Sequence, residues 1–448
     1  PNDVNHIRVY TCGPTVYNFA HIGNARPAIV SDLLVRLLRH LYPKVTYVSN
    51  ITDIDDKIIK ASQENNVPIK EITAKYEKIY NEDMSSLGVL PPDIQPHATE
   101  YIEEMIELIK KNIKNGTAYV SNEHVLFNVK SYSSYGALSG RNIDDQHGGS
   151  RVEVADYKIN PGDFILWKPS TDDQPGWESP WGFGRPGWHL ECSTMSEETL
   201  GLPFDIHGGG MDLIFPHHEN EIAQSCAAHH IDNPKKYSKY WLHNALLNMD
   251  GEKMSKSLGN IIYIRDLINK YNGEVLRLAL LSGHYRQSLS WNDKTIHQAQ
   301  TNLDRIYRVL KKTDDIQIDS ELLSDIPEQI VSALCDDLNT SKVIAQINDF
   351  AKKLSKSTND KEKKELKIKL LSSGKIMGIL NNSPDSWLGI GSVKDESNKD
   401  LIKELIDLRN MARAEKNFVK ADEIRDKLKK MEIEIEDTPN GTIWKSIK

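Results

Sequence analysis

Cysteine is scarce in this chain, and long apolar runs are absent. Four cysteines are spread over 448 residues, too few and too far apart for a disulfide-rich scaffold. No apolar run approaches the about 18 residues that a membrane-spanning helix needs, and the N-terminus has no basic segment followed by a small-residue cleavage site. These absences exclude a disulfide scaffold and a membrane-spanning protein, and they predict a cytoplasmic location.

A strong charge of either sign is also lacking. The formal net charge is −8 at pH 7, which argues against a protein wholly dedicated to wrapping nucleic acid. With 39% hydrophobic and 27% charged residues, the composition is typical of a soluble globular protein. The length favours about three domains of about 150 residues each.

Two strand–helix units open the chain. Residues 7–12 and 45–49 are short, apolar and β-rich, and a helical pattern follows each of them. Strands that alternate with helices predict a parallel sheet, whose ligands bind at the carboxyl ends of the strands. His21 and Thr52 would both lie at that edge.

An insertion then interrupts the sheet domain, and helices follow it. We expect paired strands at 118–120 and 124–129, within an inserted segment that covers residues 113–202. Helical periodicity runs from 292 to about 380, and the last 50 residues form a separate small unit. The chain is therefore predicted to be an α/β protein with added helical parts.

The turn before the first helix carries His21-Ile22-Gly23-Asn24. It offers an imidazole, a glycine where a nucleotide can approach the backbone, and a helix N-terminus that favours phosphate. By itself the motif is weak, since a lone His-x-Gly is more often an ordinary turn.

A second motif, Lys253-Met254-Ser255-Lys256-Ser257, lies in a glycine-flanked loop. Two lysines there could close over a triphosphate and neutralise the charge that builds on the leaving pyrophosphate. A solvated basic loop is the plain alternative. Both motifs, in this order across a predicted parallel sheet, favour activation of a carboxylic acid by ATP.

A possible metal site lies close to the first motif. Cys12 precedes His21 by nine residues, and His217 and Glu221 are four apart, so that a helix would place them on one face. Together with Cys192 they offer two thiolates, an imidazole and a carboxylate, a tetrahedral set for Zn²⁺. Buried free cysteines and a structural histidine turn remain the alternative.

The two motifs resemble the signatures of class I aminoacyl-tRNA synthetases. The resemblance narrows to the cysteinyl-tRNA synthetase family over residues 10–27, 187–193, 204–225 and the lysine loop. It implies a Rossmann-like parallel-sheet catalytic domain with an insertion, followed by an α-helical bundle and a small C-terminal domain. The implied boundaries are 1–112 and 203–245 for the catalytic domain, 113–202 for the inserted connective domain, 246–291 for a lysine-signature stem-contact region, 292–385 for the bundle and 399–448 for a C-terminal anticodon-binding domain.

The resemblance also implies an activity and the residues that carry it. Cysteine and ATP would give cysteinyl-adenylate, and cysteine would pass to the 3′ end of cysteine tRNA. Cys12, Cys192, His217 and Glu221 would hold one zinc ion per chain, which binds the substrate thiolate. His21, Lys253 and Lys256 would be catalytic, and Mg²⁺ would accompany ATP at His21, Gly23, Asn24 and Lys256. Thr52 and Trp188 would lie in the amino-acid pocket, with Asp212 near the amino group.

Several points depart from that pattern or stay open. Many class I enzymes have a second histidine where this chain has Asn24, which can donate a hydrogen bond but carries no charge. Cys226 and Cys335 fall outside the motifs, and we expect them to pack in the core. Trp444 could offer a stacking surface for unpaired bases. We expect a monomer with no membrane partner.

Two other functions remain alternatives. A ligase that joins cysteine to a small amine would share the signatures and the metal site, but it would not need residues 292–448. A non-catalytic RNA-binding relic would not need an intact lysine motif.

Overall fold

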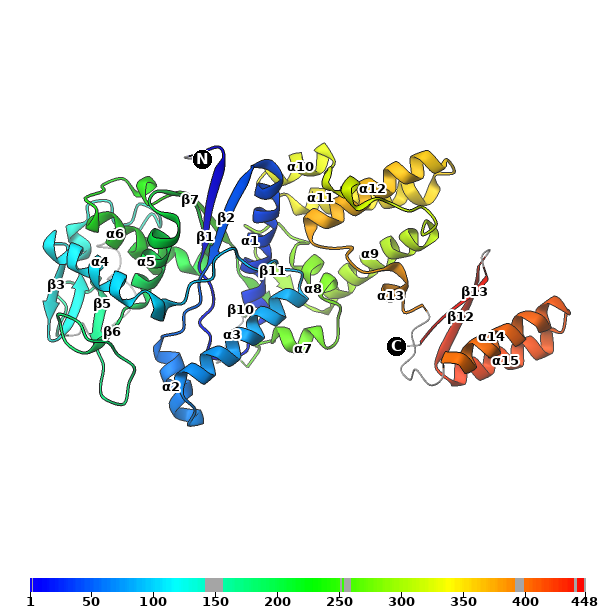
Figure 1. The fold of residues 1–448 in the computed structure, drawn as a ribbon, viewed down its shortest axis with the longest axis horizontal. Helices are drawn as coiled ribbons and strands as arrows, with labels where there is room; N and C mark the ends of the chain where they lie inside the picture. Colours follow the sequence, from blue (N-terminus) through cyan, green and yellow to red (C-terminus); the bar gives the residue numbers. More distant parts are fainter. Residues whose placement is uncertain are drawn as a thin grey trace. The chain divides into compact units, whose positions relative to one another are not determined.

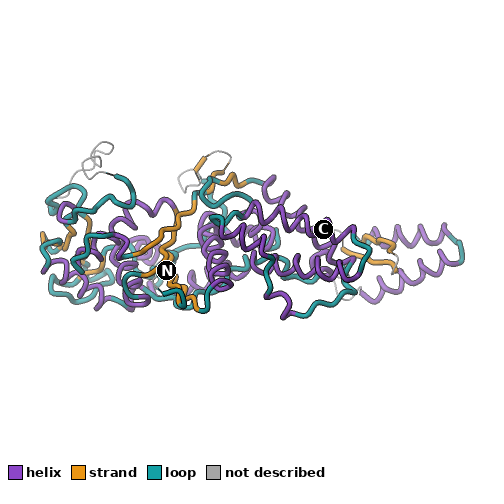
Figure 2. Tube along the Cα trace, turned by 90° about the horizontal axis from the view of Figure 1, so that it is seen from above, coloured by secondary structure: helices purple, strands orange, loops and turns teal. Residues whose placement is uncertain are grey.

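The computed structural model describes residues 1, 3–141, 156–249, 252–253, 259–390, 399–438 and 441–446. The chain divides into two compact units. The first comprises residues 1–296 and 334–341, and the second comprises residues 297–333 and 342–448. Helices are the commonest regular element (Figure 2). No helix among the described residues is both long and apolar enough to cross a bilayer.

The first unit is built on a parallel sheet, which confirms the prediction from the strand–helix alternation (Figure 1). Its strand order is β2-β1-β7-β8, and every neighbouring pair is parallel. The strands are β1 (His6–Thr11), β2 (Lys44–Ser49), β7 (Phe204–Gly210) and β8 (Ser238–Asn244). The predicted bounds of the first two strands are correct to within a residue.

Helix α1 (Ile22–Leu41) connects β1 to β2. Ile22, Ile29 and Leu33 are at most 1% exposed, and their helical spacing gives α1 the buried face that packs on the sheet. The remaining helices of this unit up to residue 291 are α2 (Asp56–Asn65), α3 (Ile69–Ser86), α4 (Ile102–Lys114), α5 (Trp188–Leu200), α6 (Glu219–Ala228), α7 (Ile264–Ile268) and α8 (Gly273–Leu280).

Arg26 on α1 is buried, although arginine is rarely found inside a protein. Its guanidinium donates to the carbonyl oxygens of Ala245 and Leu246 at 2.6 and 3.1 Å, and to those of His284 and Gln287 at 3.2 and 2.7 Å. Burial lowers the pKa of Arg26 to about 10. The helix of the first signature is thereby tied to the segments that follow β8 and precede the helical part.

The inserted segment forms its own antiparallel sheet in the order β3-β4-β5-β6. Its strands are β3 (Ala118–Ser121), β4 (His124–Phe127), β5 (Phe164–Pro169) and β6 (Gly184–Pro186), so the predicted strand pair is confirmed with a shorter second strand. A third, small sheet joins β9 (Leu247–Met249), β10 (Glu252–Lys253) and β11 (Leu289–Trp291).

The C-terminal half is helical as predicted. Its helices are α9 (Asp293–Lys312), α10 (Glu328–Cys335), α11 (Thr340–Lys356), α12 (Asp360–Met377) and α13 (Pro384–Leu388). Two helices, α14 (Lys399–Ala414) and α15 (Phe418–Lys430), then pack with a hairpin of β12 (Ile433–Thr438) and β13 (Gly441–Ser446) around a core of their own.

The two cysteines outside the motifs differ in their surroundings. Cys226 is fully buried in the core of the first unit, which confirms the prediction for that residue. Cys335 is exposed, so the prediction that it packs in the core is wrong. It lies on the outer face of α10, whose buried face is formed by Ile330, Ala333 and Leu334.

Candidate active site

A cavity of about 690 Å³ opens at the carboxyl ends of the parallel strands. Cys12 follows β1, Ser49 ends β2, Gly210 ends β7 and Asn244 ends β8, and all four line the cavity. This is the edge at which parallel α/β sheets bind their ligands. The sheet therefore brings together residues that are up to 232 positions apart in the chain.

The first signature lies at the rim of this cavity. His21 is the N-cap of α1, and Gly23 and Asn24 follow in the first turn. A Cβ atom on Gly23 would lie 2.9 Å from His21 Nδ1, so a larger residue would press on the imidazole. Asn24 Oδ1 accepts a 3.0 Å hydrogen bond from the His21 backbone N–H, as in a capping box. Its amide NH₂ is thus the end that can donate to a phosphate.

The second signature is described only in part. Lys253 ends β10, whose backbone pairs with β9, and Leu247 of β9 lines the cavity. Lys256 lies outside the described residues. The roles of both lysines therefore stay predictions.

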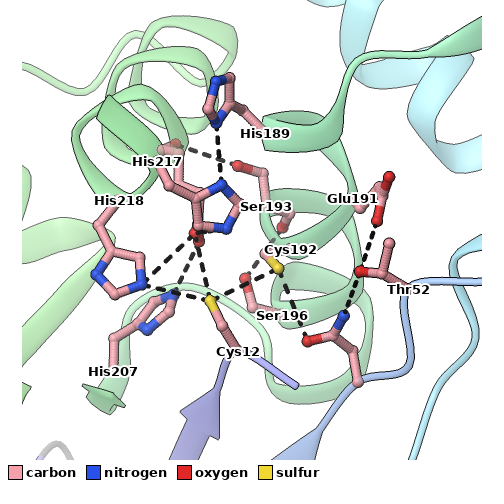
Figure 3. A network of polar contacts seen from close by, with 12 residues as sticks. Cys12, Thr52, His189, Glu191, Cys192, Ser193, Ser196, His207, His217 and His218 are labelled. Carbon is pink, nitrogen blue, oxygen red and sulfur yellow. Dashed lines mark hydrogen bonds and ion pairs between the residues drawn. The ribbon is translucent and has the colours of Figure 1, made fainter. Parts of the chain in front are cut away.

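The four predicted metal ligands converge at the inner wall of the cavity. Figure 3 shows Cys12, Cys192 and His217 pointing toward one another. Cys12 Sγ lies 3.7 Å from Cys192 Sγ and 3.7 Å from Glu221 Oε1, and His217 Nε2 lies 3.0 Å from the same carboxylate oxygen. One ligand atom from each of the four residues lies within 4.8 Å of all the others. Cys12 lines the cavity, while the other three are at most 2% exposed.

The donor set fits zinc. Tetrahedral Zn–S bonds of about 2.3 Å would separate two sulfurs by about 3.8 Å, close to the distance between Cys12 and Cys192. Two sulfurs, one imidazole nitrogen and one carboxylate oxygen form a set that zinc prefers to magnesium or calcium. His217 reaches this position from a π-helical turn, Ile214–His218, which runs directly into α6. The expected i, i+4 contact to Glu221 therefore forms across a junction rather than within one regular helix.

A second group by the same criterion contains Cys12, His207, His218 and Glu221. His218 Nε2 lies 3.3 Å from Cys12 Sγ, and His207 Nε2 lies 2.8 Å from Glu221 Oε2. This group holds one sulfur instead of two, and soft thiolates favour zinc. We therefore assign His207 and His218 as residues that contact and orient the proposed ligands Glu221 and Cys12.

Sequence reasoning missed these orienting residues. They are His189, His207, His218, Tyr237 and His243. The Nδ1 atoms of His189 and His217 are 2.9 Å apart, and Tyr237 donates to Glu221 Oε2 at 2.9 Å. Such outer contacts orient metal ligands. The sequence offered a signal only for His189 and His218, which lie directly beside Trp188 and His217.

The electrostatics of the cluster fit a deprotonated thiol. The pKa of Cys192 falls to about 6, because the Cys12 thiol donates a hydrogen bond to its sulfur and His217 lies beside it. Burial raises the pKa of Cys12 well above its ordinary value. Burial also opposes protonation of His217, but the Glu221 carboxylate outweighs it and raises the pKa of His217 to about 10. Burial lowers the pKa of His189 to about 3, which keeps this ring neutral.

The residues predicted for the amino-acid pocket occupy different positions. Trp188 is 40% exposed, lines the cavity and stacks on the His217 ring at 4.1 Å between centroids. Asp212 lines the cavity from the segment after β7. Thr52 is 2% exposed and donates at 3.0 Å to Glu191 Oε2, and it is absent from the described residues that line the cavity.

Asn50 joins Thr52 to the metal cluster and was not predicted. Its Oδ1 accepts a 2.9 Å hydrogen bond from the Gly13 backbone N–H and lies 3.7 Å from Cys192 Sγ, while its Nδ2 donates to Thr52 Oγ1 at 3.3 Å. A Cβ on Gly13 would lie 1.6 Å from the Asn50 carbonyl oxygen. Glycine at this position is therefore required by the close approach of the ends of β1 and β2.

The small C-terminal unit, formed by α14, α15 and the β12–β13 hairpin, contradicts one expectation. Trp444 is 8% exposed and packs in the core between helices and hairpin, so the prediction that it offers a stacking surface is wrong. Both terminal nitrogens of Arg409 donate to Asp437 at 2.8 Å, so that side chain is committed within the unit. The aromatic residue on its surface is Phe418, which is 60% exposed.

Comparison with known proteins agrees with this architecture. Residues 1–301 match the family described as tRNA synthetases class I (C) catalytic domain, and residues 329–381 match the DALR domain. The cysteine–tRNA ligase of Rhodospirillum rubrum is 50% identical over 446 residues, which cover 99% of this chain and 96% of that protein. The cysteine–tRNA ligase of Parvibaculum lavamentivorans is 51% identical over 446 residues, covering 99% and 94%.

Solved structures share the fold at low sequence identity. Methionyl-tRNA synthetase of Mycobacterium tuberculosis in complex with methionyl-adenylate superposes with a TM-score of 0.60 at 15% identity, covering 89% of this chain and 96% of that one. The LeuRS–tRNA–LeuAMS complex of Agrobacterium radiobacter gives 0.59 at 11% identity, covering 84% and 86%. The catalytic-domain match and the two relatives that are similar over nearly their whole length show that the chain belongs to the cysteine–tRNA ligases, a family of class I aminoacyl-tRNA synthetases.

Proposed function

We propose that this chain activates cysteine with ATP to cysteinyl-adenylate and transfers the cysteinyl group to the 3′ end of cysteine tRNA. The observation that carries the proposal is Cys12. It follows β1, lines the cavity that the His21 signature also lines, and belongs to the four-residue metal set. A nucleotide-binding motif and a thiol-selecting centre thus share one cleft.

The metal we propose is zinc, held by Cys12, Cys192, His217 and Glu221. When bound, zinc supplies a soft Lewis acid that prefers a thiolate to an alcohol and lowers the pKa of a thiol. Serine differs from cysteine by oxygen in place of sulfur, a difference that a pocket selecting by shape separates weakly. A metal that reads the sulfur directly would make separate editing of serine unnecessary.

The outer contacts fix the orientation of the ligands. If His217 presents Nε2 to the metal, its Nδ1 carries the proton and donates to the neutral His189 ring, 2.9 Å away. The Glu221 carboxylate is held through Oε2 by His207 and Tyr237, which leaves Oε1 directed at Cys12 and His217.

The adenylation chemistry in this proposal is positioning and electrostatics. The carboxylate of cysteine attacks the α-phosphorus of ATP, and pyrophosphate leaves. His21 and the amide of Asn24 would hold the phosphates at the N-terminus of α1, and Lys253 and Lys256 would neutralise the leaving pyrophosphate with Mg²⁺. Asp212, a carboxylate on the cavity wall, would bind the substrate ammonium group. Thr52 would help to position the site through its hydrogen bonds to Asn50 and Glu191.

We further propose that the C-terminal unit contacts unpaired bases of the tRNA. Phe418, the aromatic residue exposed on that unit, begins α15, and Lys420 lies in the same first turn. An exposed ring beside a cation suits base stacking next to a phosphate. The helical half, residues 292–448, favours tRNA as the acceptor, because a ligase that joins cysteine to a small amine would not need these residues.

The test is cysteine-dependent exchange of pyrophosphate into ATP, followed by transfer of labelled cysteine to a cysteine tRNA transcript. Absence of exchange by the zinc-loaded protein would refute the enzymatic proposal and favour a relic. Exchange without charging of tRNA would favour the small-amine ligase. Exchange followed by charging would support the proposal as stated.

A further inference from the structure

A second cavity of about 230 Å³ adjoins the main cleft, and its lining combines residues of the first signature with residues that follow the second. His21, Asn24 and Lys57 line both cavities. The other wall of this side cavity is formed by Ile261 and Tyr263, which follow the lysine signature in the chain. The side cavity therefore lies between the start of the first signature and the segment beyond the second.

Backbone hydrogen bonds fix this arrangement. The Ile22 N–H donates to the Ile262 carbonyl at 2.9 Å, and the Ile264 N–H donates to the Ala20 carbonyl at 3.0 Å. The two chain segments thus run together like neighbouring strands on either side of His21. The segment that follows the lysine signature therefore lies directly beside the first turn of α1.

Lys57 gives the side cavity its charge. Among the described residues that line either cavity, Lys57 is the only lysine or arginine. Its Nζ lies 5.8 Å from the centre of the Tyr17 ring, and it forms no ion pair with any described residue. The neighbouring carboxylate of Asp56 is engaged by Lys168 and Arg185 at 2.7 and 3.1 Å, and that of Asp55 caps the backbone of α2.

The remaining lining is neutral and rich in groups that can donate a hydrogen bond. No described aspartate or glutamate lines the side cavity. Apart from Lys57, its polar residues are Thr15, Tyr17, Asn18, His21, Asn24, Tyr76, Tyr80 and Tyr263. An ammonium group among hydroxyls and amides, without a carboxylate, matches an anion rather than a cation.

The aromatic rings do not form a stacking slot. Phe19 meets the rings of Tyr76 and Tyr263 at 88° and 64°, so these rings pack edge to face against one another. A base stacks on the open face of a ring, and edge-to-face packing covers part of these ring faces. The terminal adenosine of a tRNA is therefore the weaker candidate for this cavity.

We propose that the side cavity receives the pyrophosphate end of ATP, and that Lys57 is a third phosphate-binding cation beside the two lysines of the signature. This inference rests on the proposed activation of an acid by ATP. Lys57 would bind the β- and γ-phosphates in the substrate and the pyrophosphate after it leaves. Because Lys57 lines both cavities, the same side chain could contact the phosphates of bound ATP and the released pyrophosphate.

The test compares Lys57→Met with Lys57→Arg, and uses Lys60→Met as the matched control. Lys60 lies on the same helix, pairs with Glu64 at 3.6 Å and lines neither cavity. Calorimetric titration with magnesium pyrophosphate measures binding without any reaction. Because a charge-assisted contact is lost, we expect affinity for pyrophosphate to fall about ten- to hundredfold in Lys57→Met. Lys57→Arg and Lys60→Met should stay near the wild type.

Exchange kinetics give the second readout. In Lys57→Met the KM for ATP should rise by a similar factor, while the KM for cysteine should change less than about twofold. Thermal unfolding of each variant checks that it is folded. Unchanged pyrophosphate binding in Lys57→Met, an equal loss in Lys60→Met, or an effect confined to tRNA would overturn the inference. Pyrophosphate binding that depends on Lys57 in a protein without cysteine-dependent exchange would support the inference and refute the proposed function alone.

Discussion

The sulfurs of Cys12 and Cys192, 180 positions apart in the chain, lie 3.7 Å from each other. Cys12 directly follows β1, and Cys192 lies in the second turn of α5. Since α5 packs on β1 and β2, the same contacts that build the core of the first unit set the distance between the two thiols. The candidate metal site is therefore positioned by the core of the first unit.

Replacing Cys192 with serine should remove zinc. The alcohol does not ionise near neutral pH and is a poor zinc ligand, so we expect less than about a tenth of the wild-type zinc per chain after dialysis. Inductively coupled plasma mass spectrometry measures this directly. Cys226→Ser is the control, because Cys226 is equally buried and lies outside the ligand set. Full zinc content in Cys192→Ser would remove this residue from the site.

Replacing His189 with phenylalanine should weaken zinc binding without removing a ligand. Phenylalanine keeps an aromatic ring at this position but lacks the nitrogen that contacts His217 Nδ1. Outer contacts of this kind contribute about ten- to hundredfold in metal affinity. Competition with a chelator of known zinc affinity measures the change. The half-buried His124, which lies outside the metal cluster, should leave zinc affinity as it is when it is replaced by glutamine; an equal loss there would contradict a specific role for His189.

The fold could be predicted from the sequence more fully than the residues that contact the proposed metal ligands. The end of β1 and the i, i+4 pair of His217 and Glu221 could be predicted, because strand–helix alternation and helical spacing act locally along the chain. The choice of Trp188 rested on the resemblance to the family. His207 and Tyr237 could not be predicted, since their contacts to Glu221 arise only when β7 and β8 pack beside α6. Trp444 was misjudged because a large ring near the chain's end can equally fill a small core.

Replacing Arg26 with alanine should strongly destabilise the first unit. The four carbonyl oxygens that Arg26 contacts would lose a charged partner, a loss of about 3 to 5 kcal/mol for a buried site. Urea unfolding followed by circular dichroism gives the change in the free energy of unfolding. Arg39→Ala, on the exposed face of the same helix, should cost less than about 1 kcal/mol. Equal effects would show that the buried network contributes nothing special.

The ion pair between His97 and Glu77 should make stability depend on pH. Burial opposes protonation of His97, but the Glu77 carboxylate, 3.0 Å away, outweighs it and raises the pKa of His97 above its usual 6.5. A raised folded-state pKa stabilises the fold below the unfolded pKa, and this contribution is lost as the pH rises through the folded pKa. The difference in the free energy of unfolding between wild type and His97→Gln, measured by urea titration, should therefore be larger at pH 6 than at pH 8.5, by less than about 1 kcal/mol. A pH-independent difference would contradict the assignment.

Replacing Phe418 with alanine should weaken tRNA binding and leave amino-acid activation intact. A stacked base contributes about 1 to 3 kcal/mol, so the KM for tRNA should rise about five- to hundredfold while pyrophosphate exchange is unchanged. Val419→Ala, which removes the neighbouring exposed side chain, serves as the control. An unaltered KM for tRNA in Phe418→Ala would exclude a stacking role for this ring.

In the proposed mechanism, a zinc ion held by Cys12, Cys192, His217 and Glu221 binds the sulfur of the substrate. Zinc K-edge X-ray absorption on the zinc-loaded protein, with and without cysteine, counts the sulfur ligands. We expect two sulfur ligands in the protein alone and a third when cysteine is added, with no change when serine is added. A sulfur count that stays at two with saturating cysteine would contradict this mechanism.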